Sequence, residues 1–563
     1  MAASNEWTIM FFLAGDNNLS PGMISELKAL KDAGFQQNTT VLAHFDPNEL
    51  GAPTRIFNIN QKRKSGKAFS VIGEGRDPYV HHLDEDQVKP EMIDASRGEA
   101  SRAVREAFER RRGAAANLPR GTTDADARKE PTVAEALKDF LGFCREQHPA
   151  NHYMLFLIGH GLIVGNDAFL PDEHPVSSVS LEKLEEILRR FGDGVRGDGG
   201  EFQLLGLHSC SMSAVEVAYQ LKGTANYMIG TQGLSYVGCW PYRKLLVKSF
   251  NAVERMMEKR ETDSRAAVDV ALLVKDIYSL SLHSATDFSF AGYSFDQCLC
   301  RMRAREVEKL TEPIQELVRA LKRGLGPVTR PEDEDPENGR VKRLVLLAHW
   351  ESQSFWQEMY TDLFDFCLCL SRSCDAGNGL QKPIIEACEH VMAGLTALVV
   401  HSDNFGSKYM YAHGLSIYFP WSRPDEETDG DILARYQNYA FNKELRDDSW
   451  LSFLDLYFDR TQRLHRQIEE GASPRKNTDD ILAEPEADRF LRAAAETFDP
   501  TGVLSDGPKP IPSMGDDPKP IPSVGGVCQC PSIKNYPKVR VDDDGATRKL
   551  TFSMTEGAAE AFK

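Results

Sequence analysis

Short apolar runs alternate with amphipathic segments of helical length through the first half of the chain. The runs have the length of strands and occur at residues 7–13, 40–45, 54–59, 152–158, 202–207 and 226–230. Helical spacing of apolar positions is found between them, at residues 23–30, 91–112, 133–147, 181–191 and 213–221. Strands that alternate with such helices form right-handed crossover units. We therefore predict an α/β fold with a mostly parallel sheet that is flanked by helices.

The second half has a different pattern. Residues 246–325 are charged and helical in periodicity, and residues 330–340 are typical of a solvated loop. Further strands are predicted at residues 344–348, 397–401 and 415–419, and polar loops in the first half at residues 113–130 and 192–200.

Four segments are predicted from these changes of pattern. Residues 1–245 form the core, and residues 246–465 form a helical subdomain with additional strands that complete it. Residues 466–535 are a linker rich in Pro and Gly that contains the sequence PKPIPS twice, at 508–513 and 518–523. Residues 536–563 form a small tail, with a hairpin predicted from strands at 538–541 and 549–553.

Charge and cysteine content exclude several classes of partner and site. The chain has 66 basic and 84 acidic residues, a formal net charge of −18, so nucleic acids and anionic membranes are not expected partners. No positively charged segment precedes the first apolar run, and no run reaches the length of a membrane span. Eleven scattered cysteines without C-x-x-C or zinc spacing indicate free thiols. We expect a cytoplasmic protein without a metal site.

Two predicted strand ends carry residues with possible chemistry. One strand ends at Gly159-His160-Gly161, and the other ends at His208-Ser209-Cys210 and leads into a helix. Parallel strands present their carboxyl ends at one edge of a sheet, where an imidazole and a thiol can form a catalytic dyad. The residues alone also allow a second interpretation, in which His160 closes a strand and Cys210 fills a gap in the core.

Several stretches resemble the clostripain family of cysteine peptidases, which belongs to the caspase-like clan. They are, in order, WTIMFFLAGDNNL (7–19), LFLIGHG (155–161), LLGLHSCSMSAVEVAYQL (204–221), GCWPY (238–242) and YAHGLSIYFP (411–420). The resemblance covers about the first 420 residues and implies a caspase-like sheet in a cysteine endopeptidase. It implies that Cys210 is the nucleophile, that His160 is the acid and base, and that the N–H groups of Gly161 and Cys210 bind the oxyanion.

The resemblance also implies cleavage after Arg or Lys, but the chain departs from the family pattern here. The family commonly has Asp two residues before the cysteine, where this chain has His208, and the segment after the next strand begins with Thr231 in place of acidic residues. Asp16, at the end of the first strand, is the remaining candidate for an acid in the substrate pocket. It is equally consistent with an Asx turn that closes the strand.

Relatives are often precursors that are cut between the histidine and cysteine segments. The exposed, glycine-rich stretch at 190–200 therefore makes Arg190 and Arg196 candidate processing sites, with residues 110–120 as a second region. Calcium is possible by family resemblance only, with Asp193 and Asp198 as candidate ligands, and no other cofactor is expected. The string Gly192-x-Gly194-x-x-Gly197 follows a helix, which argues against a dinucleotide site.

These observations predict a cysteine endopeptidase whose partners are protein or peptide substrates. An upstream activating protease, or a partner that docks on the PKPIPS repeats, is a further possibility. The alternative from another class is a catalytically weak, protease-like scaffold or binding protein, which is suggested by His208 and by the additional tail.

Overall fold

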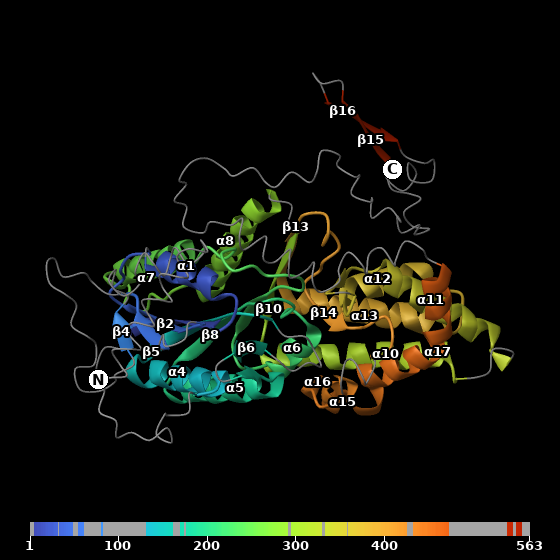
Figure 1. Cartoon of the computed structure of the whole chain (residues 1–563), viewed down its shortest axis with the longest axis horizontal. Coiled ribbons are helices and arrows are strands. Elements are labelled where there is room, and N and C mark those ends of the chain that lie inside the picture. Colours follow the sequence, from blue (N-terminus) through green and yellow to red (C-terminus); the bar gives the residue numbers. More distant parts are fainter. Residues whose placement is uncertain are drawn as a thin grey trace, which may run out of the picture. The chain divides into compact units, whose positions relative to one another are not determined.

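The apolar runs build a mixed sheet, which has nine strands in the part of the chain that the computed structural model describes (Figure 1). The order across the sheet is β13-β10-β9-β8-β5-β1-β2-β3-β4. The five adjacent strands β9, β8, β5, β1 and β2 are parallel. Outside them the pairing is antiparallel, between β3 and β2, between β10 and β9, and between β13 and β10. The bounds are β1 (Asn5–Gly15), β2 (Thr39–Pro47), β3 (Arg55–Asn58), β4 (Val80–His82), β5 (Ala150–Ile158), β8 (Glu201–His208), β9 (Tyr227–Gly230), β10 (Phe295–Arg301) and β13 (Val399–Phe405).

The described residues are 5–31, 33–48, 54–60, 80–82, 131–161, 169–173, 176–290, 294–328, 333–356, 358–424, 432–471, 538–543 and 548–553. The chain as a whole divides into two compact units, one of residues 1–465 with 491–502 and one of residues 466–490 with 503–563. In the second unit, β15 (Lys538–Asp543) and β16 (Arg548–Ser553) pair antiparallel; they overlap the two strands predicted in the tail. The predicted helix at 91–112, the loop at 113–130 and the PKPIPS repeats lie outside the described residues.

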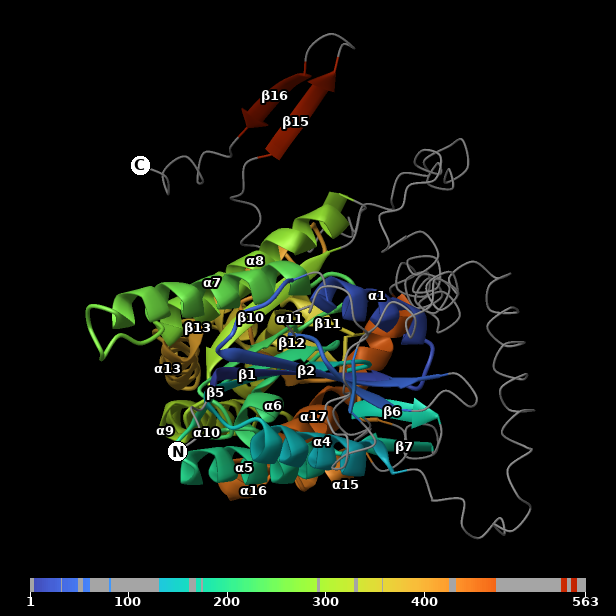
Figure 2. The same cartoon turned by 90° about the vertical axis from the view of Figure 1, so that its left-hand side faces the viewer.

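Helices cover both faces of the sheet, as Figure 2 shows. One face packs against α1 (Ser20–Lys31), α7 (Tyr242–Arg260) and α8 (Val270–Phe290), and the other against α4 (Val133–Gln147), α5 (Leu181–Gly197) and α6 (Val215–Gln220). Strand β1 shows why its sequence is continuously apolar. The Phe11 ring contacts Tyr242 of α7, whereas the next ring, Phe12, contacts Phe140 of α4. Burial on both faces removes any need for polar alternation, and the predicted α/β fold is confirmed.

A second group of helices lies beyond the β10–β13 side of the sheet (Figure 1). They are α9 (Ala304–Val307), α10 (Thr311–Leu325), α11 (Pro336–Glu351), α12 (Leu363–Ser373), α13 (Lys382–Leu398), α15 (Ile432–Gln437), α16 (Ala440–Leu445) and α17 (Trp450–Gly471). Two small sheets are also present: β6 (Phe169–Glu173) with β7 (Val176–Val179), and β11 (Ser354–Phe355) with β12 (Tyr360–Asp362) and β14 (Ser416–Tyr418). The Ser416 N–H donates to the Ser213 carbonyl at 3.0 Å and joins β14 to the segment after Cys210.

The loop predicted at 330–340 ends early, because α11 begins at Pro336, and three other predicted elements were wrong. Residues 344–348 are helical, because Asp335 and Pro336 begin α11 and the buried Val341, Val345 and His349 follow at helical spacing. Residues 246–325 were predicted to be helical, but this segment contains strand β10. The strand forms because it pairs with β9 on one side and with β13 on the other.

The third error concerns the loop at 192–200, because helix α5 continues to Gly197. A Cβ on Gly192 would lie 2.7 Å from the carbonyl oxygen of Thr224. This glycine therefore permits close packing of the helix on a neighbouring turn, and it does not make the segment a flexible loop.

Candidate active site

The strand ends that carry His160 and Cys210 lie side by side. Strands β5 and β8 are parallel neighbours, Ile158 pairs with His208, and the Gly159 N–H donates to the His208 carbonyl at 3.4 Å. A Cβ on Gly161 would lie 2.7 Å from the Cys210 nitrogen and 2.6 Å from its carbonyl carbon. The backbone of the histidine segment therefore touches the backbone of the cysteine segment, and only glycine allows this approach.

His160 contacts a residue of the turn that follows the first strand. Its Nε2 lies 2.6 Å from Oδ1 of Asn18, which is exposed and lies three residues beyond the end of β1. Burial lowers the pKa of His160 below its ordinary value of 6.5, so the imidazole is neutral at pH 7.

Cys210 is partly exposed, and its sulfur lies against the backbone of Ser235. The Ser235 N–H donates to Sγ at 3.3 Å, and the thiol faces the Ser235 carbonyl oxygen at 3.5 Å. Burial raises the pKa of Cys210, an effect that the Ser235 hydrogen bond opposes and nearby Asp296 strengthens. The resting site thus holds a neutral thiol and a neutral imidazole.

A buried acid fixes the segment that contacts the thiol. The Asp296 carboxylate accepts the N–H of Gln232 at 2.5 Å and that of Gly233 at 2.8 Å, and Asp362 accepts from the Gln232 side chain at 2.9 Å. The Gly233 carbonyl in turn accepts the N–H of Ser211, the residue after the cysteine, at 3.0 Å. Burial raises the pKa of Asp296 to about 7.

The structure does not support His208 as a pocket residue. Its side chain is 2% exposed, the Nε2–H donates to the Tyr236 carbonyl at 2.7 Å, and Nδ1 accepts the Tyr242 hydroxyl at 2.6 Å. The ring also stacks on Trp240, with the centroids 4.9 Å apart. Because the pleat directs this last residue of β8 toward α7, the imidazole belongs to the core.

The other two predicted pocket residues are also buried. Thr231 is 4% exposed, and its hydroxyl lies 3.3 Å from the carbonyl oxygens of Ser209 and Gly233. Asp16 is 4% exposed and lies beside Asp172, whose pKa is raised to about 8 by burial and by Asp16 and Asp46. The acid at the end of β1 therefore faces further acids at this edge of the sheet.

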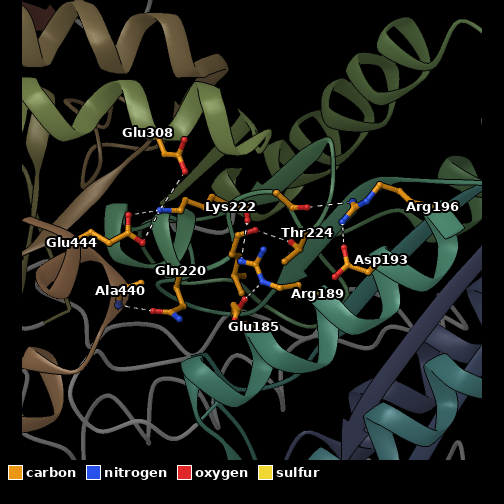
Figure 3. A network of polar contacts seen from close by, with 12 residues as sticks. Glu185, Arg189, Asp193, Arg196, Gln220, Lys222, Thr224, Glu308, Ala440 and Glu444 are labelled. Atoms are coloured by element: carbon orange, nitrogen blue, oxygen red, sulfur yellow. Dashed lines mark hydrogen bonds and ion pairs between the residues drawn. The ribbon is translucent and has the colours of Figure 1, made fainter.

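Arg190 and Arg196 both lie within helix α5 and not in the predicted loop. Figure 3 shows Arg196 paired with Asp193, and its guanidinium also donates to the Gly223 carbonyl at 3.3 Å. Asp198 lies 3.4 Å from the guanidinium of Arg145. Both candidate calcium ligands thus lie beside an arginine on the surface of the protein. Among the described residues, no group of three or more His, Cys, Asp or Glu side chains is placed to hold a metal ion.

Sequence reasoning missed Asn18, Ser235 and Asp296. Asn18 had a usable signal, because it follows a predicted strand that ends at the same edge as His160 and Cys210. Asp296 had none, since its strand β10 was predicted to be helical. Ser235 acts through backbone atoms, which side-chain chemistry does not reveal.

The chain was compared with protein-family models, curated proteins and solved structures. The family model for the clostripain family, peptidase family C11, matches residues 12–455. Similar solved structures include an inactive zymogen C11 protease from Parabacteroides distasonis, with 15% identity, 79% of this chain and 99% of that chain covered, and a TM-score of 0.45. Another is a secreted C11 cysteine protease from Bacteroides thetaiotaomicron in complex with an irreversible peptide inhibitor, with 14% identity, coverage of 80% and 99%, and a TM-score of 0.44. No curated protein matches the sequence. None of the described helices is long and apolar enough to cross a membrane.

Proposed function

The chain belongs to the clostripain family and is a cysteine peptidase, and on this basis we propose that it cleaves peptide bonds through a dyad of Cys210 and His160. One observation carries the proposal. Gly161, the residue after His160, is in backbone contact with Cys210 at the edge where β5 and β8 end. This contact supports a geometry in which one substrate carbonyl reaches both residues.

The chemistry follows from the neutral resting pair. As a peptide binds, the thiol proton passes to His160 and Sγ attacks the carbonyl carbon, which gives a tetrahedral oxyanion facing the N–H groups of Gly161 and Cys210. The C–N bond then breaks and the imidazolium gives its proton to the leaving amine. Water, deprotonated by His160, attacks the thioester, and collapse of the second intermediate releases the acid and restores the thiol.

The dyad is tested by substitution and labelling. Cys210→Ala and His160→Ala should each reduce kcat/KM for a peptide substrate by at least about 1,000-fold. A peptidyl acyloxymethyl ketone should label the wild-type chain at Cys210 and fail to label His160→Ala. Cys374→Ala is the matched control, because this partly exposed thiol ends α12 and is not part of the proposed site. Full activity in Cys210→Ala would overturn the proposal, and a biological role retained without the thiol would favour the scaffold.

A preference for Arg or Lys before the cleaved bond is also proposed, on the strength of family membership. Asp16 is an acid at the substrate edge, although its side chain is buried and the neighbouring Asp172, whose pKa is raised to about 8, adds no negative charge at pH 7. A peptide library read by mass spectrometry tests the preference, with Cys210→Ala as the blank. Cleavage after acidic or apolar residues would contradict it.

We further propose activation by a cut between His160 and Cys210. Arg190 and Arg196 lie in this interval, and cleavage at either requires local unwinding of α5, which is held against the Gly223 turn. The new amino terminus of active protein should therefore follow Arg190 or Arg196 and be absent in the Arg190→Gln/Arg196→Gln variant. An active protein with one unbroken chain would exclude this activation.

A further inference from the structure

We propose that Asn18 is a positioning residue of this site, which holds the His160 ring in one orientation and one tautomer. The inference deepens the proposed dyad and rests on it. It starts from the 2.6 Å contact between Asn18 Oδ1 and His160 Nε2, which joins two residues 142 positions apart in the chain.

Asn18 is held in place by a turn that is itself well ordered by hydrogen bonds. The neighbouring Asn17 is 5% exposed, and its side-chain amide donates to the carbonyl oxygens of Ala14 at 2.9 Å and Pro171 at 3.0 Å. Its Oδ1 accepts the N–H of Leu19 at 3.0 Å. Bonds on both sides of Asn18 therefore fix the backbone from which its side chain reaches His160.

The amide oxygen determines which nitrogen carries the proton. An oxygen acceptor at Nε2 requires Nε2–H, which leaves the lone pair of a neutral ring on Nδ1 to receive the thiol proton. When the ring becomes an imidazolium, the same oxygen stabilises it by a charge-assisted hydrogen bond. Because the amide is uncharged, it does not retain the proton as strongly as a carboxylate would, and Nδ1 can pass it to the leaving amine.

Electrostatics around His160 agree with this role. Burial disfavours the charged ring, so the resting imidazole is neutral and depends on a fixed tautomer to act as a base. With the ring free to rotate, either nitrogen could face the thiol and a large share of the molecules would be unproductive.

Kinetics of Asn18 variants test the inference. Asn18→Ala should lower kcat by about 10- to 100-fold and leave KM within about twofold, since orientation of the catalytic ring is lost and substrate contacts are not. The melting temperature should not change, because Asn18 is exposed. Asn18→Asp keeps the oxygen acceptor and should recover most of kcat. Its charge should move the inflection of the pH profile that belongs to His160 to higher pH.

Asn151→Ala is the matched control, because this exposed asparagine lies near the start of β5, at the opposite edge of the same sheet, and its side-chain amide donates a hydrogen bond to Glu6. Wild-type kcat in Asn18→Ala, with Cys210→Ala inactive, would overturn the inference and leave the dyad intact. A loss of kcat in Asn18→Ala that is accompanied by a lower melting temperature would show that Asn18 has only a structural role. An unshifted pH profile in Asn18→Asp would also contradict the proposal. Activity in Cys210→Ala would instead overturn the dyad itself.

Discussion

At the scale of single residues, His208 couples stability to pH. Burial lowers its pKa from 6.5 to about 4, so the folded chain keeps the ring neutral in a range where the unfolded chain protonates it. The neutral His208 ring therefore contributes fully to the stability of the folded protein above pH 6.5, and this contribution is lost as the pH falls toward 4. Between pH 7 and 5 we expect the wild type to lose about 2 kcal/mol of unfolding free energy through this residue. Urea unfolding at both pH values measures this effect, and the unfolding free energy of His208→Gln should fall by about 2 kcal/mol less than that of the wild type.

His390 provides the control for this measurement. It is exposed, and its hydrogen bond to Glu316 raises its pKa, so its contribution is lost as the pH rises. His390→Gln should therefore alter the pH dependence only slightly and in the opposite direction, since solvent screens a surface pair. An identical pH dependence in wild type and His208→Gln would show that the buried imidazole does not titrate as proposed.

At the scale of elements, the approach of β5 to β8 depends on the absence of one side chain. A Cβ on Gly161 would meet backbone atoms of Cys210, which cannot move away as a flexible side chain could. We expect Gly161→Ala to separate the two strand ends and to lower kcat/KM by about 100-fold. The measurement is steady-state kinetics together with thermal unfolding.

Gly142 gives the matched substitution within α4. A Cβ there would have no heavy atom within 4 Å beyond its own helix, so Gly142→Ala should raise stability by about 0.5–1 kcal/mol and leave kcat/KM unchanged. If Gly161→Ala were as active as Gly142→Ala, close contact between the two strand ends would not be required for catalysis.

At the scale of the whole catalytic unit, Glu216 connects the two halves of the chain. This residue of α6 is fully buried, and its carboxyl accepts the Tyr418 N–H at 2.8 Å and the Tyr436 hydroxyl at 2.7 Å, both more than 200 positions away. Glu216→Ala should destabilise the protein by about 2–4 kcal/mol, because it leaves buried donors without their acceptor. Urea unfolding measures this effect, and exposed Glu186→Ala should be neutral.

The pH dependence of the same residue has the opposite sign to that of His208. Burial raises the pKa of Glu216 from 4.5 to about 7, so the folded carboxyl keeps a proton that the unfolded chain releases. Stability from this group is complete below pH 4.5 and is lost as the pH rises through 7. Glu216→Gln keeps an acceptor and should lose less stability than wild type between pH 5 and 8. Equal losses would show that Glu216 is already ionised in the folded protein.

Local sequence determined the strands of the core and the position of His160 and Cys210 at their ends. Doubly buried parallel strands are continuously apolar, and polar residues follow where each run stops, so residues 152–158 and 202–207 identified the edge without any knowledge of the fold. The same reasoning failed for Leu344–Ala348, because a short apolar run does not distinguish a strand from one turn of a buried helix.

Only the tertiary structure decided which side chains meet at that edge. Asn18 reaches His160 because β1 is the neighbour of β5, and Asp296 reaches Gln232 because β10 pairs with β9. His208 faces the core because the pleat directs it there, and Gly192 lies inside a helix because a distant turn packs against it. Strand order and side-chain direction depend on contacts between segments far apart in the chain, and local periodicity does not contain that information.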